Sequence, residues 1–420
     1  MSNTAETVVE KILGTHCGYP VKAGDVVVAN IDLAMATDGS GPLTIDIFYK
    51  MGKERTWDSK KVLMVIDHYV PCPNDKVAGL HDIMRDFCKR GNGILLDLGE
   101  GICHQLLPEK GYIKPGEIIV GGDSHTCTYG ALNTLGTGIG SSDLAVAMAT
   151  GKLWFRVPET IKVVFENSLP VGVTAKDVAL YLVGKLGARG AIYKSIEFHG
   201  SSIKGLDMDD RLTICNMVVE TGAKCGIMPF DSITENWLKA AGINDCQGVH
   251  PDEGANYEKV LSIDLGNISP QIAVPHRVDN VLPAAELEGT RINMVVIGTC
   301  TNGRLKDLEI AANILKEHRI AQGVEVIVVP ASRKIYVEAA RKGILELFVS
   351  KGAMVLPPGC GPCCGSSAGI PGDGENVLST ANRNFLGRMG NIKSEIFLGS
   401  PLSAIAAAIT GKITDPRRID

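Results

Sequence analysis

Short apolar runs recur along the chain, and each is followed by a polar loop and then by a helical pattern. The runs cover residues 62–67, 93–98, 117–120, 161–165, 294–297, 324–329 and 354–356. Strands that alternate with helices in this way predict parallel sheets covered by helices. We therefore expect an α/β fold.

The chain is too long for one hydrophobic core. It has 420 residues, of which 45% are hydrophobic, and single cores stop growing at about 250 to 300 residues. The strand and helix rhythm changes in the segments 156–160 and 280–289, which contain Pro158 and Pro283. We expect three α/β domains that span residues 1–157, 158–287 and 288–420.

Charge and hydropathy exclude two classes of function. The net charge of −5 provides no broad basic field for nucleic acid. No run approaches the 18 to 20 apolar residues, roughly, that a membrane helix needs. The segment 1–6 lacks the basic and apolar stretches of an export signal, so we expect a cytoplasmic protein whose 12 cysteines are reduced.

Three of these cysteines lie in glycine-rich turns rather than in apolar segments. Cys300 follows the run 294–297, so it is expected at the carboxyl end of a strand, where open α/β sheets bind ligands. Cys360 and Cys363 share the loop 357–365, whose prolines and glycines disfavour a regular element and allow both sulfurs to point at one centre. Three thiolates can hold a metal cluster and leave one position open, which favours iron and sulfide. Zinc, redox chemistry and buried inert cysteines are the alternatives.

Aspartate and histidine residues mark the ends of other predicted strands. Asp67 ends the run 62–67 and His68 follows it, while Asp123 and His125 come after the run 117–120. His104 comes after the run 93–98. An aspartate beside a histidine can orient and charge the imidazole for proton transfer. A structural hydrogen bond explains one such histidine, but three at strand ends indicate a site.

Two further pairs carry groups that suit an anionic substrate. Helical spacing over 213–220 places Asn216 and Glu220 four residues apart on one face. Arg383 and Arg388 follow the cysteine loop, and guanidinium groups pair with carboxylates through parallel hydrogen bonds. An exposed helix face and surface arginines are the structural alternatives.

The glycine run 136–140 is close to a nucleotide-binding loop pattern. It lacks a preceding strand and an acidic partner about 20 residues later. We therefore expect no dinucleotide site there.

Three motifs resemble those of the aconitase superfamily, and within it the separate large subunits of 3-isopropylmalate dehydratase and homoaconitase. The motifs are Gly-Asp-Ser-His-Thr at 122–126, Gly-Thr-Cys-Thr-Asn-Gly-Arg at 298–304 and Gly-Cys-Gly-Pro-Cys at 359–363. They occur in the order of that family, and the resemblance runs nearly end to end. It implies three α/β/α domains arranged around a central iron-sulfur cluster cleft, without the swivelling fourth domain of aconitases.

The resemblance also implies roles for the residues named above. Cys300, Cys360 and Cys363 are expected to bind one 4Fe-4S cluster whose remaining iron is open to substrate oxygens. An acid pair would protonate the departing hydroxyl, and other polar groups would arrange the iron-bound water. The expected catalytic residues are Asp67, His68, His104, Asp123, His125 and Glu220, and the expected substrate-binding residues are Ser124, Asn216, Arg383 and Arg388.

The implied activity is that of a hydro-lyase. Water is eliminated from a 2-hydroxy di- or tricarboxylate and added back in the reverse orientation, with a base supplied by a separate small subunit that carries the swivel domain. The expected substrate is 3-isopropylmalate of leucine biosynthesis, and homoaconitate and 2,3-dimethylmalate are its competitors. An iron-sensing RNA-binding protein and a zinc protein are the alternatives from other classes, and the acidic balance argues against the first.

Two positions depart from the pattern of that family. Thr37 stands before Asp38 where related large subunits often carry a histidine, a difference of the kind that accompanies a change of substrate. Cys364 directly follows Cys363. We expect Cys364 to be a bystander that competes for iron only when a cluster is lost.

Overall fold

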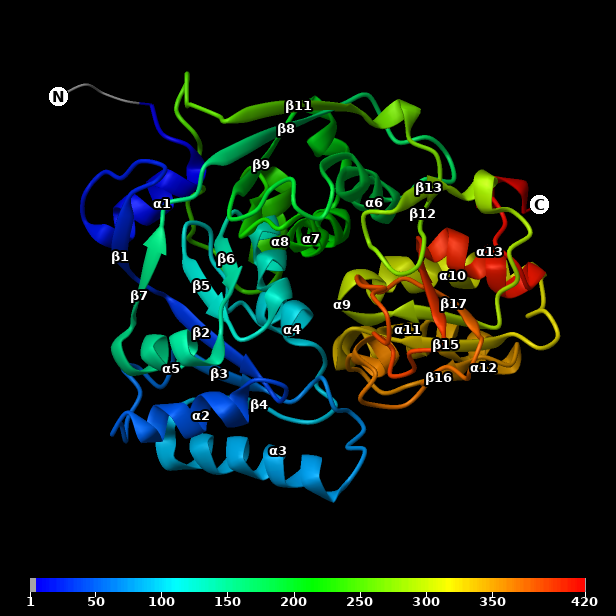
Figure 1. Ribbon diagram of the computed structural model, residues 1–420, viewed down its shortest axis with the longest axis horizontal. Coiled ribbons are helices and arrows are strands. Elements are labelled where there is room, and N and C mark those ends of the chain that lie inside the picture. The colour runs from blue at the N-terminus through cyan, green and yellow to red at the C-terminus, as the bar shows by residue number, and fades with distance from the viewer. Residues whose placement is uncertain (1–4, 420) are drawn as a thin grey trace.

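The computed structural model describes residues 5–419, whose first part builds a parallel five-stranded sheet of order β4-β3-β2-β5-β6 (Figure 1). The strands are β2 (Leu33–Thr37), β3 (Val62–Val65), β4 (Ile94–Leu96), β5 (Ile118–Gly121) and β6 (Leu135–Gly138). The outer face carries α2 (Gly41–Lys50), α3 (Asp75–Phe87) and α5 (Ser141–Thr150), and the inner face carries α4 (Cys103–Glu109). This part also contains α1 (Val8–Cys17) and the antiparallel pair β1 (Val26–Asn30) and β7 (Lys152–Arg156).

Both faces of this sheet are buried, and alternate residues of its strands enter two different cores. Ala34 and Met64 pack in the core of the outer helices, whereas Met35 and Leu63 pack in the core that contains α4. Strands buried on both faces read as continuous apolar runs. This burial explains why the run 62–67 is conspicuous in the sequence.

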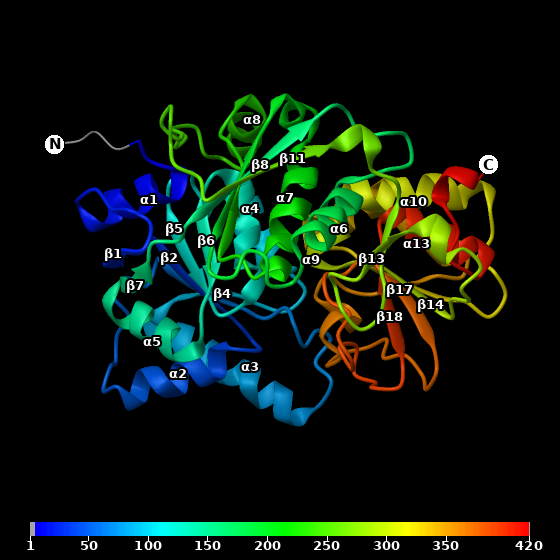
Figure 2. The ribbon, with the colours of Figure 1, turned by 45° about the horizontal axis from the view of Figure 1, so that its top comes forward.

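The middle of the chain forms a parallel sheet of order β10-β9-β8-β11. Its strands are β8 (Thr160–Glu166), β9 (Ser195–His199), β10 (Cys225–Ile227) and β11 (Lys259–Asp264), and its helices are α6 (Ala175–Leu186), α7 (Met208–Met217) and α8 (Ser232–Ala240). Figures 1 and 2 show α4 and α7 in the middle of the molecule, between the first sheet and the last part of the chain.

The last part of the chain forms a mixed sheet of order β13-β12-β18-β17-β14-β15-β16. Its strands are β12 (Gln271–Ala273), β13 (Val281–Pro283), β14 (Met294–Gly298), β15 (Glu325–Val329), β16 (Met354–Val355), β17 (Asn376–Ser379) and β18 (Glu395–Leu398). Its helices are α9 (Thr299–Asn302), α10 (Leu305–Glu317), α11 (Arg333–Arg341), α12 (Ile344–Ser350) and α13 (Pro401–Thr410). On one face, Val296 packs in a core with Leu180 and Val183 of α6, so a helix from the middle of the chain covers this sheet.

β12 and β13 come before the domain boundary expected near 288, yet they belong to the last sheet. They pair with each other and, through Ala273 and Leu398, with β18. By sheet membership, the third part of the chain begins near Gln271. Strands of three residues are too short to show a readable alternation.

Each of the seven apolar runs overlaps a strand, and in chain order these strands are β3, β4, β5, β8, β14, β15 and β16. Helix α5 is closed by Gly151, which adopts a left-handed conformation with φ 66°. Two strands of the first sheet were not predicted, because β2 and β6 consist largely of small residues and glycine. The glycine run 136–140 is itself mostly strand β6, which the sequence did not indicate.

None of the helices within residues 5–419 has the length and apolar composition of a membrane span. The segment 1–6, in which no export signal is expected, lies mostly outside the described residues.

Candidate functional site

The carboxyl ends of three adjacent strands in the first sheet each place an aspartate at the same edge. Asp38 follows β2, Asp67 comes shortly after β3 and Asp123 comes shortly after β5. β2 lies between β3 and β5, and parallel strands end at one edge. The three carboxylates are therefore neighbours, although 29 or more residues separate them along the chain.

Asp67 orients His68 from a fully buried position. Its Oδ1 lies 2.6 Å from His68 Nδ1, and its Oδ2 accepts a hydrogen bond from the Cys103 amide at 2.7 Å. Burial alone lowers the pKa of His68, but the negative charges of Cys360 and Asp67 raise this pKa well above its ordinary value. The ring is thus held ready to carry a proton.

Asp123 connects three histidines. Its Oδ1 lies 2.7 Å from His104 Nε2 and accepts the His125 amide at 2.7 Å, and its Oδ2 lies 3.2 Å from His68 Nε2. Burial alone raises the pKa of Asp123, but the charge and hydrogen bond of His104, with further hydrogen bonds, hold it well below the ordinary range. Asp123 is therefore the ionised centre of the network.

Asp38 was quoted in the sequence only beside Thr37, yet it fixes the turn that carries His68. Its oxygens accept the amides of His68 and Tyr69, both at 2.9 Å, and lie 3.1 Å from His81 Nε2. Burial on its own would raise the pKa of Asp38, but the His81 hydrogen bond and the charge of His68 lower it below its ordinary value. The strand-end rule would have found Asp38 if β2 had been predicted.

Glu220 links the three parts of the chain. Its Oε1 lies 2.9 Å from His125 Nε2 and accepts a hydrogen bond from Arg383 Nε at 2.8 Å. Burial alone raises the pKa of Glu220, but hydrogen bonding to His125 and the charge of Arg383 lower it. α7 ends at Met217 and a 3-10 turn carries Glu220, so Asn216 and Glu220 do not share one α-helical face as expected.

The three cysteines of the sequence motifs line one cavity. Cys300, Cys360 and Cys363 are each 6% exposed and surround a space of about 230 Å³. Cys300 lies in α9, directly after β14, and Cys363 lies in a 3-10 turn. Cys360 is fixed against the first part of the chain because its amide donates to the Asp67 carbonyl at 2.9 Å.

The turn before Cys300 is tightly constrained. Gly298 has φ 138°, and a Cβ atom there would lie 2.1 Å from the Val329 carbonyl oxygen. Thr299 adopts the left-handed region with φ 67°, which costs a β-branched residue about 1 to 3 kcal/mol. Backbone strain of this size persists where the surrounding structure imposes a particular side-chain direction.

Polar hydrogens point at two of the sulfurs. Nδ2 of Asn216 and Nδ2 of Asn382 lie 3.4 and 3.3 Å from Cys300 Sγ, and Arg388 Nη2 lies 3.6 Å from Cys363 Sγ. Burial raises the pKa of the Cys300 thiol to about 11, so a positive metal centre is needed to ionise it fully.

The expected site residues fall into three groups. The expected residues that line the cavity are His68, His104, Asp123, His125, Cys300, Cys360, Cys363, Arg383 and Arg388, and Thr37, Gly39, Gly122, Cys364 and Asn382 line it as well. Asp67, Asn216 and Glu220 are buried behind this lining and contact it. Ser124 lines a neighbouring cavity of about 520 Å³, which Asp123 also borders.

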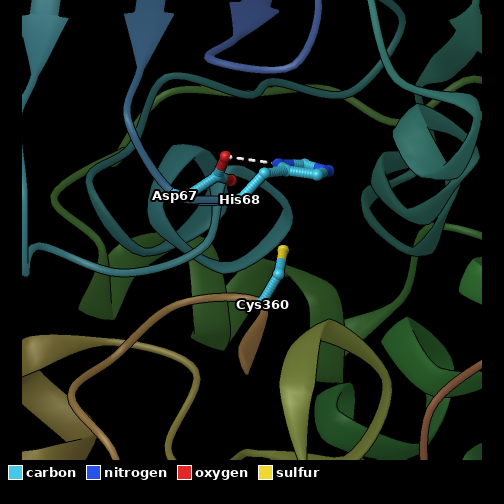
Figure 3. A group of neighbouring side chains, drawn as sticks. All are labelled: Asp67, His68 and Cys360. Carbon is cyan, nitrogen blue, oxygen red and sulfur yellow. Dashed lines mark hydrogen bonds and ion pairs between the residues drawn. The ribbon is translucent and has the colours of Figure 1, made fainter. Parts of the chain in front are cut away.

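Asp67, His68 and Cys360 form a close group, with ligand atoms within 4.8 Å of one another. Figure 3 shows the carboxylate joined to the ring and the sulfur pointing toward the ring. Because Asp67 already binds His68 and the Cys103 amide, this group is best described as a hydrogen-bonded aspartate-histidine pair beside Cys360.

Arg304 had no role assigned in the sequence, although it ends one of the motifs. It is 1% exposed and donates to the carbonyls of Cys300 at 3.0 Å and Thr301 at 2.9 Å. Its Nε donates to Gln105 at 3.1 Å, across to the first part of the chain. Arg304 therefore positions the Cys300 segment.

Comparisons with known proteins show the family to which this chain belongs. Residues 10–411 match the model of the aconitase (aconitate hydratase) family. The chain is 48% identical to 3-isopropylmalate dehydratase large subunit 1 of Methanopyrus kandleri over 413 residues, which cover 98% of this chain and 99% of that protein. It is 50% identical over 416 residues to large subunit 1 of the same enzyme from Thermotoga maritima, with 98% and 99% coverage.

The fold is also found among solved structures. The holo form of aconitase X from Thermococcus kodakaraensis superposes with a TM-score of 0.52 at 13% identity and covers 90% of this chain and 89% of that one. The expected aconitase-type α/β fold and the resemblance read from the three motifs are thus confirmed, and the chain belongs to the aconitase family.

Proposed function

We propose that this chain is the cluster-binding large subunit of a hydro-lyase that acts with a separate small subunit on 3-isopropylmalate. The observation that carries the proposal is the shared cavity, where three cysteines meet a connected set of carboxylates and imidazoles. Relatives of matching length are named large subunits of this dehydratase.

The cysteines suit a single 4Fe-4S cluster with Cys300, Cys360 and Cys363 as its ligands. Amide and guanidinium groups near two of the sulfurs are the partners that stabilise cluster thiolates and tune them. When bound, the cluster supplies Lewis-acid activation of the substrate hydroxyl at an iron that has no protein ligand.

His68 is the proposed acid. The negative charges of Cys360 and Asp67 raise the pKa of His68 and so favour a proton on the ring, and the ring lines the cavity, so it can donate to the departing hydroxyl. Asp67 acts through His68, because its carboxylate orients Nδ1 and leaves Nε2 on the side of Asp123. We assign His104, Asp123 and His125 to holding the water that is added back.

Arg383 and Arg388 are the proposed partners of the substrate carboxylates. Glu220 takes Nε of Arg383, which leaves the terminal guanidinium nitrogens for a carboxylate. Arg388 stacks over the Phe385 ring at 5.4 Å from its centroid, which fixes its direction. The base that removes the carbon-bound proton is assigned to the small subunit.

Anaerobic reconstitution with the cognate small subunit tests the proposal. Wild-type protein should take up iron and sulfide and convert isopropylmalate, with alkene formation followed by absorbance. A complex that contains zinc without sulfide would contradict the cluster. A complex that converts homocitrate, citrate or 2,3-dimethylmalate but not isopropylmalate would keep the reaction class and overturn the substrate.

A further inference from the structure

Lys176 is a buried cation to which the proposed chemistry assigns no role. It lies in the first turn of α6 and is 0% exposed. Within residues 5–419, no carboxylate forms an ion pair with it. An unpaired ammonium group is expensive to bury, and burial lowers the pKa of Lys176 to about 7 against the opposing charges of Cys300 and Cys363.

The contacts of Lys176 lead into the site. Its Nζ donates to the carbonyl oxygens of Thr380 at 2.8 Å and Ala381 at 2.5 Å. These residues form the turn after β17, and Asn382 and Arg383 follow directly. A shift of the turn would therefore move both of those side chains.

Both side chains carried by the turn contact the cysteine cavity. Asn382 donates to Cys300 Sγ at 3.3 Å, and Arg383 donates to Glu220 at 2.8 Å. Thr380 fixes the other side of the turn, because its Oγ1 accepts the Gly298 amide at 2.9 Å, two residues before Cys300. The turn is thus held between the start of α6 and the end of β14.

A methionine at position 176 would fill similar volume without the cost of a buried charge. The presence of lysine therefore calls for a negative charge nearby. Cys300 and Cys363 are the groups whose negative charge most favours the ammonium form. As metal-bound thiolates they would carry that charge permanently.

We propose that Lys176 is a positioning residue of the cluster site, which holds Asn382 and Arg383 in place and balances the negative charge of the cysteine thiolates. The inference rests on the proposed function, because the thiolate charge is present only when a cluster is bound.

The test is Lys176→Met in the full chain, reconstituted anaerobically and combined with the small subunit. We expect KM for the dicarboxylate to rise about tenfold with a smaller change in kcat. We also expect iron to be lost to a chelator several-fold faster and the electron paramagnetic resonance signal of the reduced cluster to shift. A purely structural lysine would leave KM and this signal unchanged.

Two further variants sharpen the test. Lys185→Met makes the same change at the exposed end of α6 and should behave as wild type. Lys176→Gln keeps a hydrogen-bond donor without the charge. Its KM should therefore be closer to that of wild type than its rate of iron loss is. If circular dichroism shows that Lys176→Met is unfolded, Lys176→Gln takes its place in the test. If cluster-loaded wild type and the Lys176 variants have the same KM, iron loss and resonance signal, this inference alone is rejected. If wild type binds no iron or sulfide, the inference is rejected together with the proposed function.

Discussion

The two walls of the cavity are held in different ways. The acid-base wall (Asp38, Asp67, His68 and Asp123) is held by charged groups around His68, whose ring lies 2.6 Å from Asp67 and 3.2 Å from Asp123 and whose amide donates to Asp38 at 2.9 Å. The sulfur wall consists of the three cysteines on turns, and weakly accepting sulfur cannot build such a network. Its segments are positioned instead by backbone contacts and by the buried cations Arg304 and Lys176.

This difference teaches that contacts within the protein alone hold the acid-base wall, whereas on the proposed function the sulfur wall would depend on a bound cluster and on supporting cations. Loss of a residue from the first wall should therefore affect proton transfer and spare the cluster. Loss from the second wall should affect the cluster or the fold. Four predictions follow this contrast from the largest effect to the smallest.

Cys300→Ser should abolish stable cluster binding and activity, because a hydroxyl is a far weaker iron ligand than a thiolate. Iron and sulfide per chain after anaerobic reconstitution measure the effect. Cys364→Ser is the matched control and should keep both. Full cluster content in Cys300→Ser would show that the sulfur wall is assigned wrongly.

His68→Asn should lower kcat by about 10² to 10⁴-fold, the usual range for general acid-base catalysis. Iron content should equal that of wild type, because His68 belongs to the acid-base wall. Steady-state kinetics beside metal analysis make the comparison, with His250→Asn, at an exposed position, as control. Equal losses of iron and rate would mean that the two walls are not separable.

Arg304→Met should lower the free energy of unfolding of the cluster-free protein by about 3 kcal/mol, because the buried Cys300 carbonyl and the Gln105 side chain both lose the hydrogen bond that Arg304 donates. Urea unfolding followed by circular dichroism measures this. Arg291→Met changes an exposed arginine in the same part of the chain and should have little effect. If the free energy of unfolding falls no more than in the control variant, Arg304 does not stabilise the Cys300 segment.

The pH dependence of stability should reveal Asp307, which accepts the Arg304 amide at 3.0 Å. Burial raises the pKa of Asp307 to about 7, although the charge of Arg304 opposes this, whereas the pKa in the unfolded chain is about 4. Between these values the folded protein binds more protons, so this residue makes the free energy of unfolding fall as pH rises, and its effect levels off above about pH 7.

Asp307→Asn removes that titration. The stability of the variant relative to wild type should therefore rise by about 1 kcal/mol per pH unit between about pH 5 and pH 7. Urea unfolding of the cluster-free proteins at a series of pH values measures the difference. A difference that stays constant over this range would contradict the raised pKa.

The parts of the fold that could be predicted are those with a strong local pattern. Val62 to Val65 are each 0% exposed, so β3 appears in the sequence as an uninterrupted apolar run. Strands β2, β12 and β13 were not predicted, because β2 consists largely of small residues and because β12 and β13 are only three residues long. The missed strand β2 also hid Asp38.

Candidate site residues with a recognisable local setting were predictable, and supporting residues were not. Cys300 and His68 follow strands, which made them visible. Lys176 looks like any lysine at a helix start, and its importance arises from Thr380 and Ala381, 204 and 205 residues away in the chain. Ser124 has a recognisable motif, and in the structure it lines the cavity next to that of the cysteines.

The sequence by itself determined which reactive side chains stand at the ends of strands and in turns, because residue periodicity and the sterics of glycine and proline act over a few residues. Only the tertiary structure decided which of them meet. That outcome depends on the strand order β4-β3-β2-β5 and on helices α6 and α7, which connect the outer parts of the chain. Such contacts form because apolar faces far apart in the sequence share a core, and no local pattern records which faces will pair.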